Sequence, residues 1–411
     1  MRDIMILGLF FLMLATGCQA GIADSLSLEQ AVALALRQNP GILAAQEEIR
    51  ISLGRRLQMQ ALPAANFVLS DEGIAFNPGK HPDEERELSF GVEQALEFPG
   101  KLVLRGRVGR FGEQIADYGL ARTGILVKAG VKEAYYKTVL GMRTIRTLGQ
   151  TAKLLDEFIE SASIKYQAGE VLYLDVLRAR IEKAKIRNEI IEAGKELAAD
   201  KTRLNLLLGQ KGDSPLELTT DLAFIPLTRD LASLQEEAER TRPSVLIASL
   251  KLEQARAGLK LSQMSRLPDF SLGLFFPSRR MNAWGFALGV SVPVFSNRKQ
   301  KGEILEAEAQ NAIEEISVEA VRRTLRAQVE SAFIGAKAAE EQVKLFEETL
   351  LTEVEDQLSM SITQYQYGKI DALNLLDIFR TSLEARREYL KALFLYLVSL
   401  SDLERAGEGS E

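Results

Sequence analysis

The longest regular pattern in the chain is a seam of apolar residues between positions 101 and 166, a stretch that contains no proline. Apolar residues return there at alternating spacings of four and three. The seam consists of Leu104, Val108, Phe111, Ile115 and Tyr118. Such heptad spacing is typical of a coiled-coil helix. At about 1.5 Å per residue, this helix would be on the order of 100 Å long, far longer than one globular domain.

Shorter helical segments flank the long one, and the arrangement occurs twice. In the first half they cover residues 40–62 and 173–208, which together match the long helix in length, so we expect them to stack end to end beside it. The second half is expected to have a long helix over 301–366, flanked by helices over 243–267 and 373–403.

The helix that returns after the first long one has an apolar seam of its own. Its members are Leu177, Ile181, Ala184 and Ile191. Together with the seam of the long helix, this pattern predicts an antiparallel coiled coil in each half.

Two segments of the second half alternate apolar with small or polar residues. Their apolar positions are Phe270, Leu272, Leu274 and Phe276, then Trp284, Phe286, Leu288, Val290, Val292 and Val294. Period two with one apolar face, over about 9–11 residues, is typical of membrane strands. The first half repeats the pattern at Leu88, Phe90, Val92 and Leu96, after a weaker run over 67–70. Soluble hairpins covered by helices would alternate in the same way, but the duplication favours the membrane.

Four strands cannot close a membrane barrel, since the smallest such barrels have eight, and hydrocarbon does not tolerate exposed strand edges. The chain must therefore oligomerise if these strands lie in a membrane. Two copies would supply eight strands and three would supply twelve, and only the larger barrel leaves a lumen. The expected fold is mainly α, with long antiparallel coiled-coil helices in an α-barrel and four strands per chain in a trimeric 12-stranded β-barrel.

The clearest sign of duplication is a glycine turn. Tyr166 to Gly169 returns as Tyr365 to Gly368, a repeat of 199 residues counted from Gly169 to Gly368. A period this long indicates two equivalent halves rather than a solenoid. We therefore divide the chain into a signal peptide, a first repeat, a linker, a second repeat and a disordered tail, over 1–17, 18–209, 210–229, 230–406 and 407–411.

The N-terminus carries an apolar run from Ile4 to Leu14, too short to span a bilayer and suited to a secretory signal. Leu14 to Cys18 resembles a bacterial lipobox, whose cysteine becomes lipidated, although ordinary cleavage after Ala20 is the alternative. Cys18 is the only cysteine, so an intrachain disulfide and a cysteine metal cluster are excluded. A single acyl chain anchors weakly and needs a second membrane element.

Composition gives little support to an enzyme or a nucleic-acid partner. The net charge of −6 does not attract nucleic acid. The only histidine, His81, cannot form a histidine metal site alone, and the basic segment from Gly100 to Gly109 lacks the spacing of a phosphate-binding loop. Lys101, Arg105, Arg107 and Arg110 are expected to solvate the start of the long helix. We expect no enzyme activity, no cofactor and no metal site.

Taken together, these features resemble the TolC-type outer-membrane efflux family, over nearly the whole mature chain. The most specific match is Tyr365 to Gly368 with the segment 373–377, and the weaker copy is Tyr166 to Gly169 with the segment 175–177. The resemblance implies a homotrimer in the outer membrane, continued by a helical barrel through the periplasm. It also implies that a periplasmic adaptor protein docks at the glycine turns and that an inner-membrane pump supplies energy.

In that family the tip is closed by hydrogen bonds and ion pairs between coils, and acidic residues ring the pore. Carried over by position, Asp175 and Tyr365 match the latch and Asp377 matches an acidic ring. Asn374 stands at the other acidic position, and Ile370, beside Lys369, stands where the latch arginine is usual. Alternatively, Asp175 and Asp377 are solvated carboxylates near helix N-termini.

The function implied by the resemblance is the outer-membrane channel of a tripartite efflux system, conducting small solutes such as heavy-metal ions or drugs to the exterior. The alternative is a periplasmic coiled-coil scaffold or adaptor without channel activity. An adaptor would normally carry a β-rich insertion in its helical hairpin, and none interrupts residues 101–208.

Overall fold

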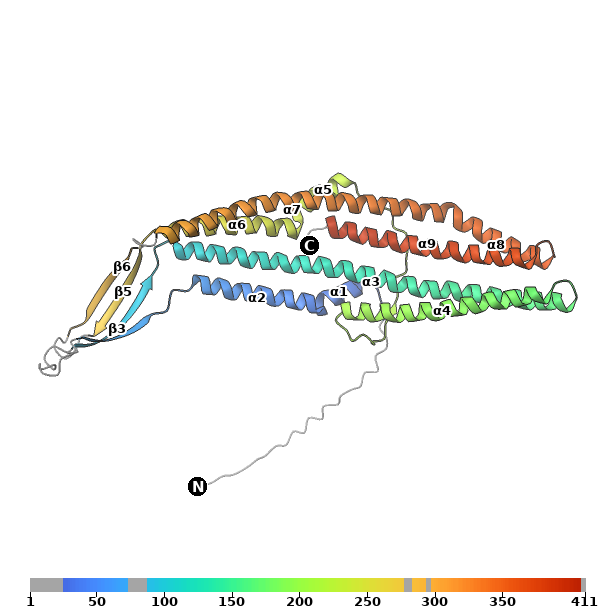
Figure 1. Cartoon of the computed structure of the whole chain (residues 1–411), viewed down its shortest axis with the longest axis horizontal. Coiled ribbons are helices and arrows are strands. Elements are labelled where there is room, and N and C mark those ends of the chain that lie inside the picture. Colours follow the sequence, from blue (N-terminus) through green and yellow to red (C-terminus); the bar gives the residue numbers. More distant parts are fainter. Residues whose placement is uncertain (1–24, 73–86, 277–282, 293–296, 408–411) are drawn as a thin grey trace, which may run out of the picture.

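The computed structural model describes residues 25–72, 87–276, 283–292 and 297–407. Long helices run side by side in an elongated layer, with a four-stranded sheet at one end and two helical turns at the other (Figure 1). Both halves of the chain contribute to the layer, to the sheet and to the turns. Cys18, His81 and Val294 lie outside the described residues.

The first half is built around α3 (Lys101–Gln167), one unbroken helix of 67 residues. α2 (Pro40–Gln60) and α4 (Tyr173–Leu207) both pack on it and follow one another along its length, as the sequence predicted (Figure 1). Asn39 begins α2, because its side chain accepts a hydrogen bond from the Gly41 amide at 2.8 Å and Pro40 needs no amide partner.

The second half repeats this plan with α6 (Pro243–Met264), α7 (Asn297–Leu345), α8 (Leu351–Gln366) and α9 (Ala372–Gly407). The long helix predicted over 301–366 contains a π-helical turn, η2 (Phe346–Leu350), between α7 and α8. The heptad pattern does not reveal this turn, since a π-turn shifts the register by one residue without interrupting the helix. α9 continues through Gly407, where the sequence analysis began the disordered tail.

Two short helices and a strand pair surround the middle of the layer. α1 (Leu28–Gln38) begins at a capping box formed by Ser27 and Gln30, and α5 (Leu231–Thr241) begins at Asp230. β1 (Ser25–Leu26) pairs in parallel with β4 (Glu217–Leu218), so the start of the described chain lies against the linker between the halves.

We call α1, the β1–β4 pair and the linker between the halves the girdle. Two buried tyrosines connect the girdle to the long helices. The Tyr135 hydroxyl donates to the Leu26 carbonyl at 2.9 Å and accepts from the Thr220 amide at 2.9 Å. The Tyr396 hydroxyl of α9 donates to the Ile225 carbonyl. Because both rings are fully buried, each hydroxyl needs these partners, and the girdle is held to α3 and α9.

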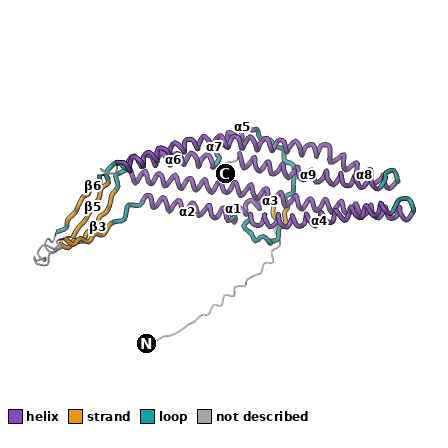
Figure 2. The backbone as a smooth tube through the Cα atoms, in the orientation of Figure 1, coloured by secondary structure: helices purple, strands orange, loops and turns teal. Residues whose placement is uncertain are grey.

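The sheet has the antiparallel order β2-β3-β5-β6, with strands β2 (Asn66–Glu72), β3 (Glu87–Leu96), β5 (Asp269–Phe276) and β6 (Gly285–Ser291). The central pair joins the two halves, with Leu96 opposite Phe270 and Phe90 opposite Phe276. Apart from the short β1–β4 pair, all strands of the described chain lie at this one end (Figure 2).

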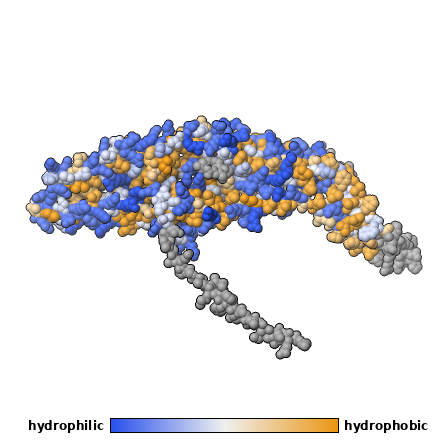
Figure 3. Space-filling view, turned by 180° about the vertical axis from the view of Figure 1, so that it is seen from behind, coloured by the Kyte–Doolittle hydropathy of each residue, from blue (hydrophilic) through white to orange (hydrophobic). Residues whose placement is uncertain are grey.

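One face of the sheet is apolar and exposed. The paired positions place the following residues on that face: Phe67, Leu69, Phe90, Val92, Phe270, Leu272, Leu274, Phe286, Leu288 and Val290. Phe286 is 77% exposed, and Figure 3 shows a largely apolar surface over the strands, whereas the helical layer is mixed. The opposite face carries mostly small or polar residues, with Phe275 as a large exception whose ring lies over Gly91 and Gly273. A Cβ on Gly289 would collide with the Ser271 hydroxyl. The predicted alternation is confirmed.

The apolar seam predicted along α4 does not face its coiled-coil partner. The side chains buried in the chain belong to Val176, Ala179, Glu182 and Ile186. Leu177 and Ile181 are 42% and 50% exposed, and Ala184 and Ile191 are exposed as well. The prediction was wrong because α4 lies at the edge of the layer, where one apolar stripe packs on α3 and a second faces outward.

The seam predicted along the start of α3 is only half-buried. In that region α3 packs on α2 through Gly106 and Gly109, and a Cβ on Gly109 would stand 3.0 Å from the Arg56 Cα. The small residues, not the large apolar ones, therefore set the closest approach of these two helices.

Candidate functional site

The two helical turns at the end opposite the sheet have the same backbone geometry. Gly169 and Gly368 have φ values of 77° and 71°, which favour glycine. In the first turn the Glu170 amide donates to the Lys165 carbonyl at 2.9 Å, and in the second the Lys369 amide donates to the Gln364 carbonyl at 2.8 Å. These bonds end both helices in the same way, so the duplicated sequence produces duplicated tips.

The two tip tyrosines have different environments. Tyr166 is exposed and its ring lies 5.4 Å from that of Tyr173, within the first tip. Tyr365 is buried, and its ring packs edge-on against the Phe158 ring of α3, with 4.9 Å between the ring centroids. Tyr365 therefore packs between the two coiled coils, whereas Tyr166 does not.

The predicted latch between Asp175 and Tyr365 is only partly assembled. Burial, with a contribution from the Asp175 carboxylate, raises the pKa of Tyr365. Its buried hydroxyl, however, has no hydrogen-bond partner among the described residues. Asp175 lies in the first turn of α4, and its carboxylate is 3.7 Å from the Arg178 guanidinium. The Asp175 carboxylate, which can accept a hydrogen bond, and the Tyr365 hydroxyl, which can donate one, are thus close without a direct hydrogen bond between them.

The other tip residues singled out by sequence are exposed. Lys369, Asn374 and Asp377 lie on the solvent side of the second tip, and Ile370 is half-buried. The Asn374 amide donates to the Asp371 carboxylate at 2.8 Å, so Asp371, which the sequence analysis did not select, holds the start of α9. In the described chain, Lys369 forms no ion pair with Asp175.

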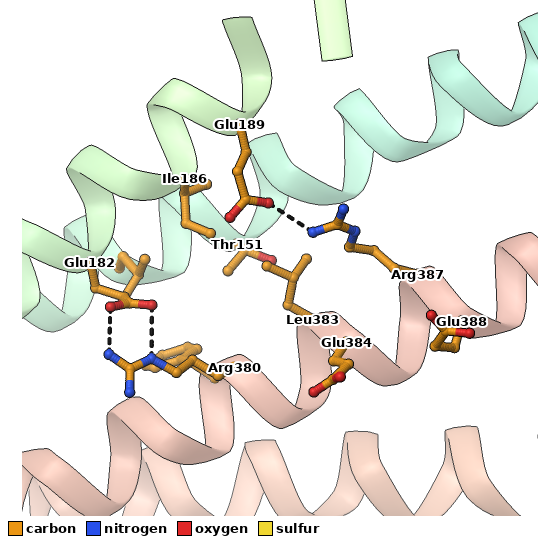
Figure 4. Close-up of a pocket in the computed structure, with 11 residues that line it drawn as sticks. Thr151, Glu182, Ile186, Glu189, Arg380, Leu383, Glu384, Arg387 and Glu388 are labelled. Carbon is orange, nitrogen blue, oxygen red and sulfur yellow. Dashed lines mark hydrogen bonds and ion pairs between the residues drawn. The ribbon is translucent and has the colours of Figure 1, made fainter. Parts of the chain in front are cut away.

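Two ion pairs that the sequence analysis missed join the halves just above the tips (Figure 4). The Arg380 guanidinium of α9 donates two hydrogen bonds to the Glu182 carboxylate of α4, at 2.8 and 2.6 Å. One heptad further, Arg387 donates to Glu189 at 2.8 Å. The hydrogen bond from Arg380 holds the pKa of Glu182 below its usual range, against the opposing effect of burial.

We call this pair of contacts the cross-half clasp: Glu182–Arg380 and Glu189–Arg387. Its residues line a groove with Thr151, Leu155, Ile186, Phe379 and Leu383. Glu182 is 8% exposed although its neighbours on the buried face of α4, Ala179 and Ile186, are apolar. The signal available in the sequence was the shared spacing of seven between the two glutamates and between the two arginines.

The described residues contain no group of three histidine, cysteine, aspartate or glutamate side chains that could hold a metal ion.

Within the ranges described, none of the helices is both long enough and apolar enough to cross a membrane.

The fold and the second half of the sequence both point to one family. Residues 234–407 match the family model described as outer membrane efflux protein. This chain is similar to that family in its second half. Over 374 residues it is 23% identical to the cobalt-zinc-cadmium resistance protein CzcC of Cupriavidus metallidurans, covering 90% of this chain and 87% of that protein. Such efflux proteins are transport proteins.

Other proteins are similar to this chain as well. The cation efflux system protein CusC of Escherichia coli K12 is 22% identical over 322 residues, covering 74% of this chain and 69% of that protein. A crystal structure of CusC matches with a TM-score of 0.78 at 19% identity, over 93% and 92% of the two chains. The outer membrane protein VceC of Vibrio cholerae matches with a TM-score of 0.77 at 16% identity, over 93% and 97%. The efflux fold therefore extends over both halves of this chain.

Proposed function

We propose that this chain is the outer-membrane channel of a tripartite efflux system, through which small solutes pass from an inner-membrane pump and a periplasmic adaptor to the exterior. The observation that carries the proposal is the exposed apolar face of the β2-β3-β5-β6 sheet at one end of a long helical layer. In the hydrocarbon core of a membrane, such an apolar face is stable without another protein layer packed on it.

Three copies would close both parts of the molecule. The sheet has two edge strands, β2 and β6, so three copies joined edge to edge would form a 12-stranded barrel. The helical layer also has two edges (Figure 1). One edge is formed by α2 and α4, which pack on α3. The other is formed by α7 and α8, which are connected to α3 through α6 and α9. Such head-to-tail contacts close into a ring.

Exposed aliphatic side chains on both edges of the layer support this closure. On the first edge, α4 presents Leu177, Ile181 and Ile191. On the second, α7 and α8 present Leu305, Ile313, Ile316, Ile334 and Met360. The stripe predicted from sequence as an internal seam would then pack on the neighbouring protomer, where its burial adds to the stability of the trimer.

The tips would form the periplasmic gate. The cross-half clasp holds the two hairpins of one protomer together, while Asp175 and Tyr365 lie closer to the turns. Repeated three times, the exposed Asp377 would place carboxylates around a narrow mouth and attract cations. Lipidation at Cys18 would add an anchor beside the barrel.

The identity of the transported solutes is also part of the proposal. CzcC is named for cobalt, zinc and cadmium resistance, CusC for cation efflux and another relative, TtgI of Pseudomonas putida, for toluene efflux. Channels of one fold thus serve different solutes, and in such a system the pump selects among them. We assign this chain small solutes, heavy-metal ions and drugs among them.

The test uses the full chain purified from outer membranes, with Cys18→Ser as the matched variant that removes any lipid anchor. A channel requires detergent in both proteins, has the mass of a trimer and conducts ions in planar bilayers. If the Cys18→Ser protein is soluble without detergent and neither protein conducts, the chain is a periplasmic scaffold and the proposal fails.

A further inference from the structure

Basic residues gather where the sheet meets the helices. The segments 55–62, 97–110, 260–269 and 297–303 flank the inner ends of the four strands and contain eleven lysines and arginines but only three acidic residues. The whole chain has the opposite balance, with 51 basic and 57 acidic residues. The junction between sheet and helices is therefore positively charged in an acidic protein.

Part of this charge braces the junction itself. Lys101 is buried, and its ammonium group lies 2.8 Å from the Asp269 carboxylate at the start of β5. Arg105 pairs with Glu97 at 2.9 Å and also donates to the Ala61 carbonyl at 3.3 Å. These contacts hold the strand ends to α2 and α3, so Lys101 and Arg105 have a structural role.

Six other cations of these segments have no such role, Arg110 and Lys260 among them. Arg107, Arg266, Arg298 and Lys301 are exposed, and in the described part of the chain none of them forms an ion pair or a side-chain hydrogen bond. We call these four residues the junction belt. Arg107 lies on an exposed face of α3 with Val103, away from Gly106 and Gly109, which contact α2.

Helix stability does not explain the belt. Arg298 and Lys301 lie in the first turns of α7, and Arg107 lies in the second turn of α3, while neither helix has an acidic residue in its first turn. The amide end of a helix is positively polarised and favours acidic residues. The charge of Arg298, in the first turn of α7, is therefore unfavourable for the isolated helix, and an anion outside the chain would offset it.

The position of the belt indicates which anion. The apolar face of the sheet defines the hydrocarbon layer, and a headgroup region of roughly 5–8 Å adjoins it on each side. Arg266 lies three residues before the start of β5, and Arg298 and Lys301 lie in the first turns of α7. Arg107 is about 10 Å along α3, within reach of a long side chain. All four fall at or near the level of the phosphates.

We propose that the junction belt binds the phosphate groups of anionic phospholipids in the periplasmic leaflet of the outer membrane. The inference rests on the proposed function, because the sheet must lie in the membrane for the belt to reach its surface. Arginine forks and lysine ammonium groups bind phosphate oxygens through charge-assisted hydrogen bonds. The belt fixes the depth of the barrel and surrounds it with anionic lipid.

The test compares lipid binding by the full-length protein in detergent, measured by native mass spectrometry, with phosphatidylglycerol and phosphatidylcholine as probes. The belt variant combines Arg107→Gln, Arg266→Gln, Arg298→Gln and Lys301→Gln. The matched control combines Lys153→Gln, Arg187→Gln, Arg203→Gln and Arg323→Gln. These control residues are equally exposed and lie along the helices far from the sheet.

The wild type and the control should bind phosphatidylglycerol about tenfold more tightly than phosphatidylcholine, and the belt variant should lose this preference. Equal binding of both lipids by the wild type would overturn the proposal, as would a preference that survives in the belt variant. Displacement of the bound lipid by an excess of inorganic phosphate would also overturn it, because the site would then take free anions.

The same samples separate this inference from the proposed function. A conducting trimer without lipid preference would refute the belt alone. A chain that neither conducts nor needs detergent would refute the channel, and the belt with it.

Discussion

At the scale of single residues, a buried carboxylate near the tips depends on the other half of the chain. Glu182 stands in a seam of small and aliphatic side chains, where a lone carboxylate would be strongly unfavourable. Arg380 satisfies both of its oxygens from the other half of the chain. The Glu182–Arg380 contact is therefore a specific connection between the coiled coils, and its loss should destabilise the tips.

Arg380→Ala should loosen the tips and raise single-channel conductance, because Glu182 would be left buried without its partner. The expected destabilisation is about 1–3 kcal/mol, the range for hydrogen bonds to charged groups. Hydrogen exchange of α9 measures the loosening. Arg187→Ala, at an exposed residue of α4 without an ion pair, is the control.

A double-mutant cycle tests the pairing itself. Adding Glu182→Gln to Arg380→Ala should change the stability little further, and additive losses of stability would contradict the pairing.

The same pair should make tip stability depend on pH. Because Arg380 lowers the pKa of Glu182 in the folded chain, the stabilisation is fully present above its ordinary value near 4.5. It is lost as the pH falls through the lowered, folded-state pKa. Hydrogen exchange at the tips, compared between the wild type and Glu182→Gln, should show a difference at neutral pH that shrinks in acid. A difference independent of pH would exclude this linkage.

Gly368→Ala should destabilise the second tip by about 1–2 kcal/mol, since alanine is strained at a positive φ. Gly194→Ala is the matched control, because Gly194 lies inside α4 with open space at its Cβ. The control should stabilise the protein slightly, by about 0.5–1 kcal/mol. Thermal unfolding measures both variants, and equal effects would mean that the turn geometry is not required.

At the scale of elements, close approach of helices depends on small residues that the apolar pattern does not reveal. The α2–α3 contact passes through Gly106 and Gly109, while the large residues of the predicted seam remain half-buried. The strands behave differently, because their alternation translated directly into one apolar face and one face of mostly small or polar residues, with Phe275 as the exception.

Gly109→Leu should separate α2 from α3 and lower the melting temperature, because even a Cβ there approaches the Arg56 backbone to 3.0 Å. Overpacking of this kind costs about 1–3 kcal/mol. Gly119→Leu, elsewhere in α3 with open space around its Cβ, is the control and should have little effect. Similar melting temperatures for both variants would show that α2 is not held by this contact.

At the scale of the whole molecule, the single chain is an open layer with two unpaired edges in its sheet and apolar stripes on its outer helices. Those features make a closed ring the natural state of the proposed channel. Leu177 and Ile181, exposed in one chain, are the residues whose role depends most on the neighbouring protomer.

Leu177→Glu combined with Ile181→Glu should weaken the trimer, because two carboxylates would be buried without partners at the edge of α4. Multi-angle light scattering in detergent should detect protomers or dimers. Leu177→Met combined with Ile181→Met keeps the stripe apolar and should leave the trimer intact. A stable trimer of the glutamate variant would place the interface elsewhere.

The sequence by itself determined the repeat, the long helices, the four strands and the glycine turns, because each depends on local periodicity or on one residue's backbone freedom. Only the tertiary structure decided which apolar stripe of α4 is buried and which residues connect the halves. A helix with two apolar stripes looks the same whichever one its partner covers. The clasp joins residues 198 positions apart, Glu182 with Arg380, and such a pairing exists only once the two coiled coils lie side by side.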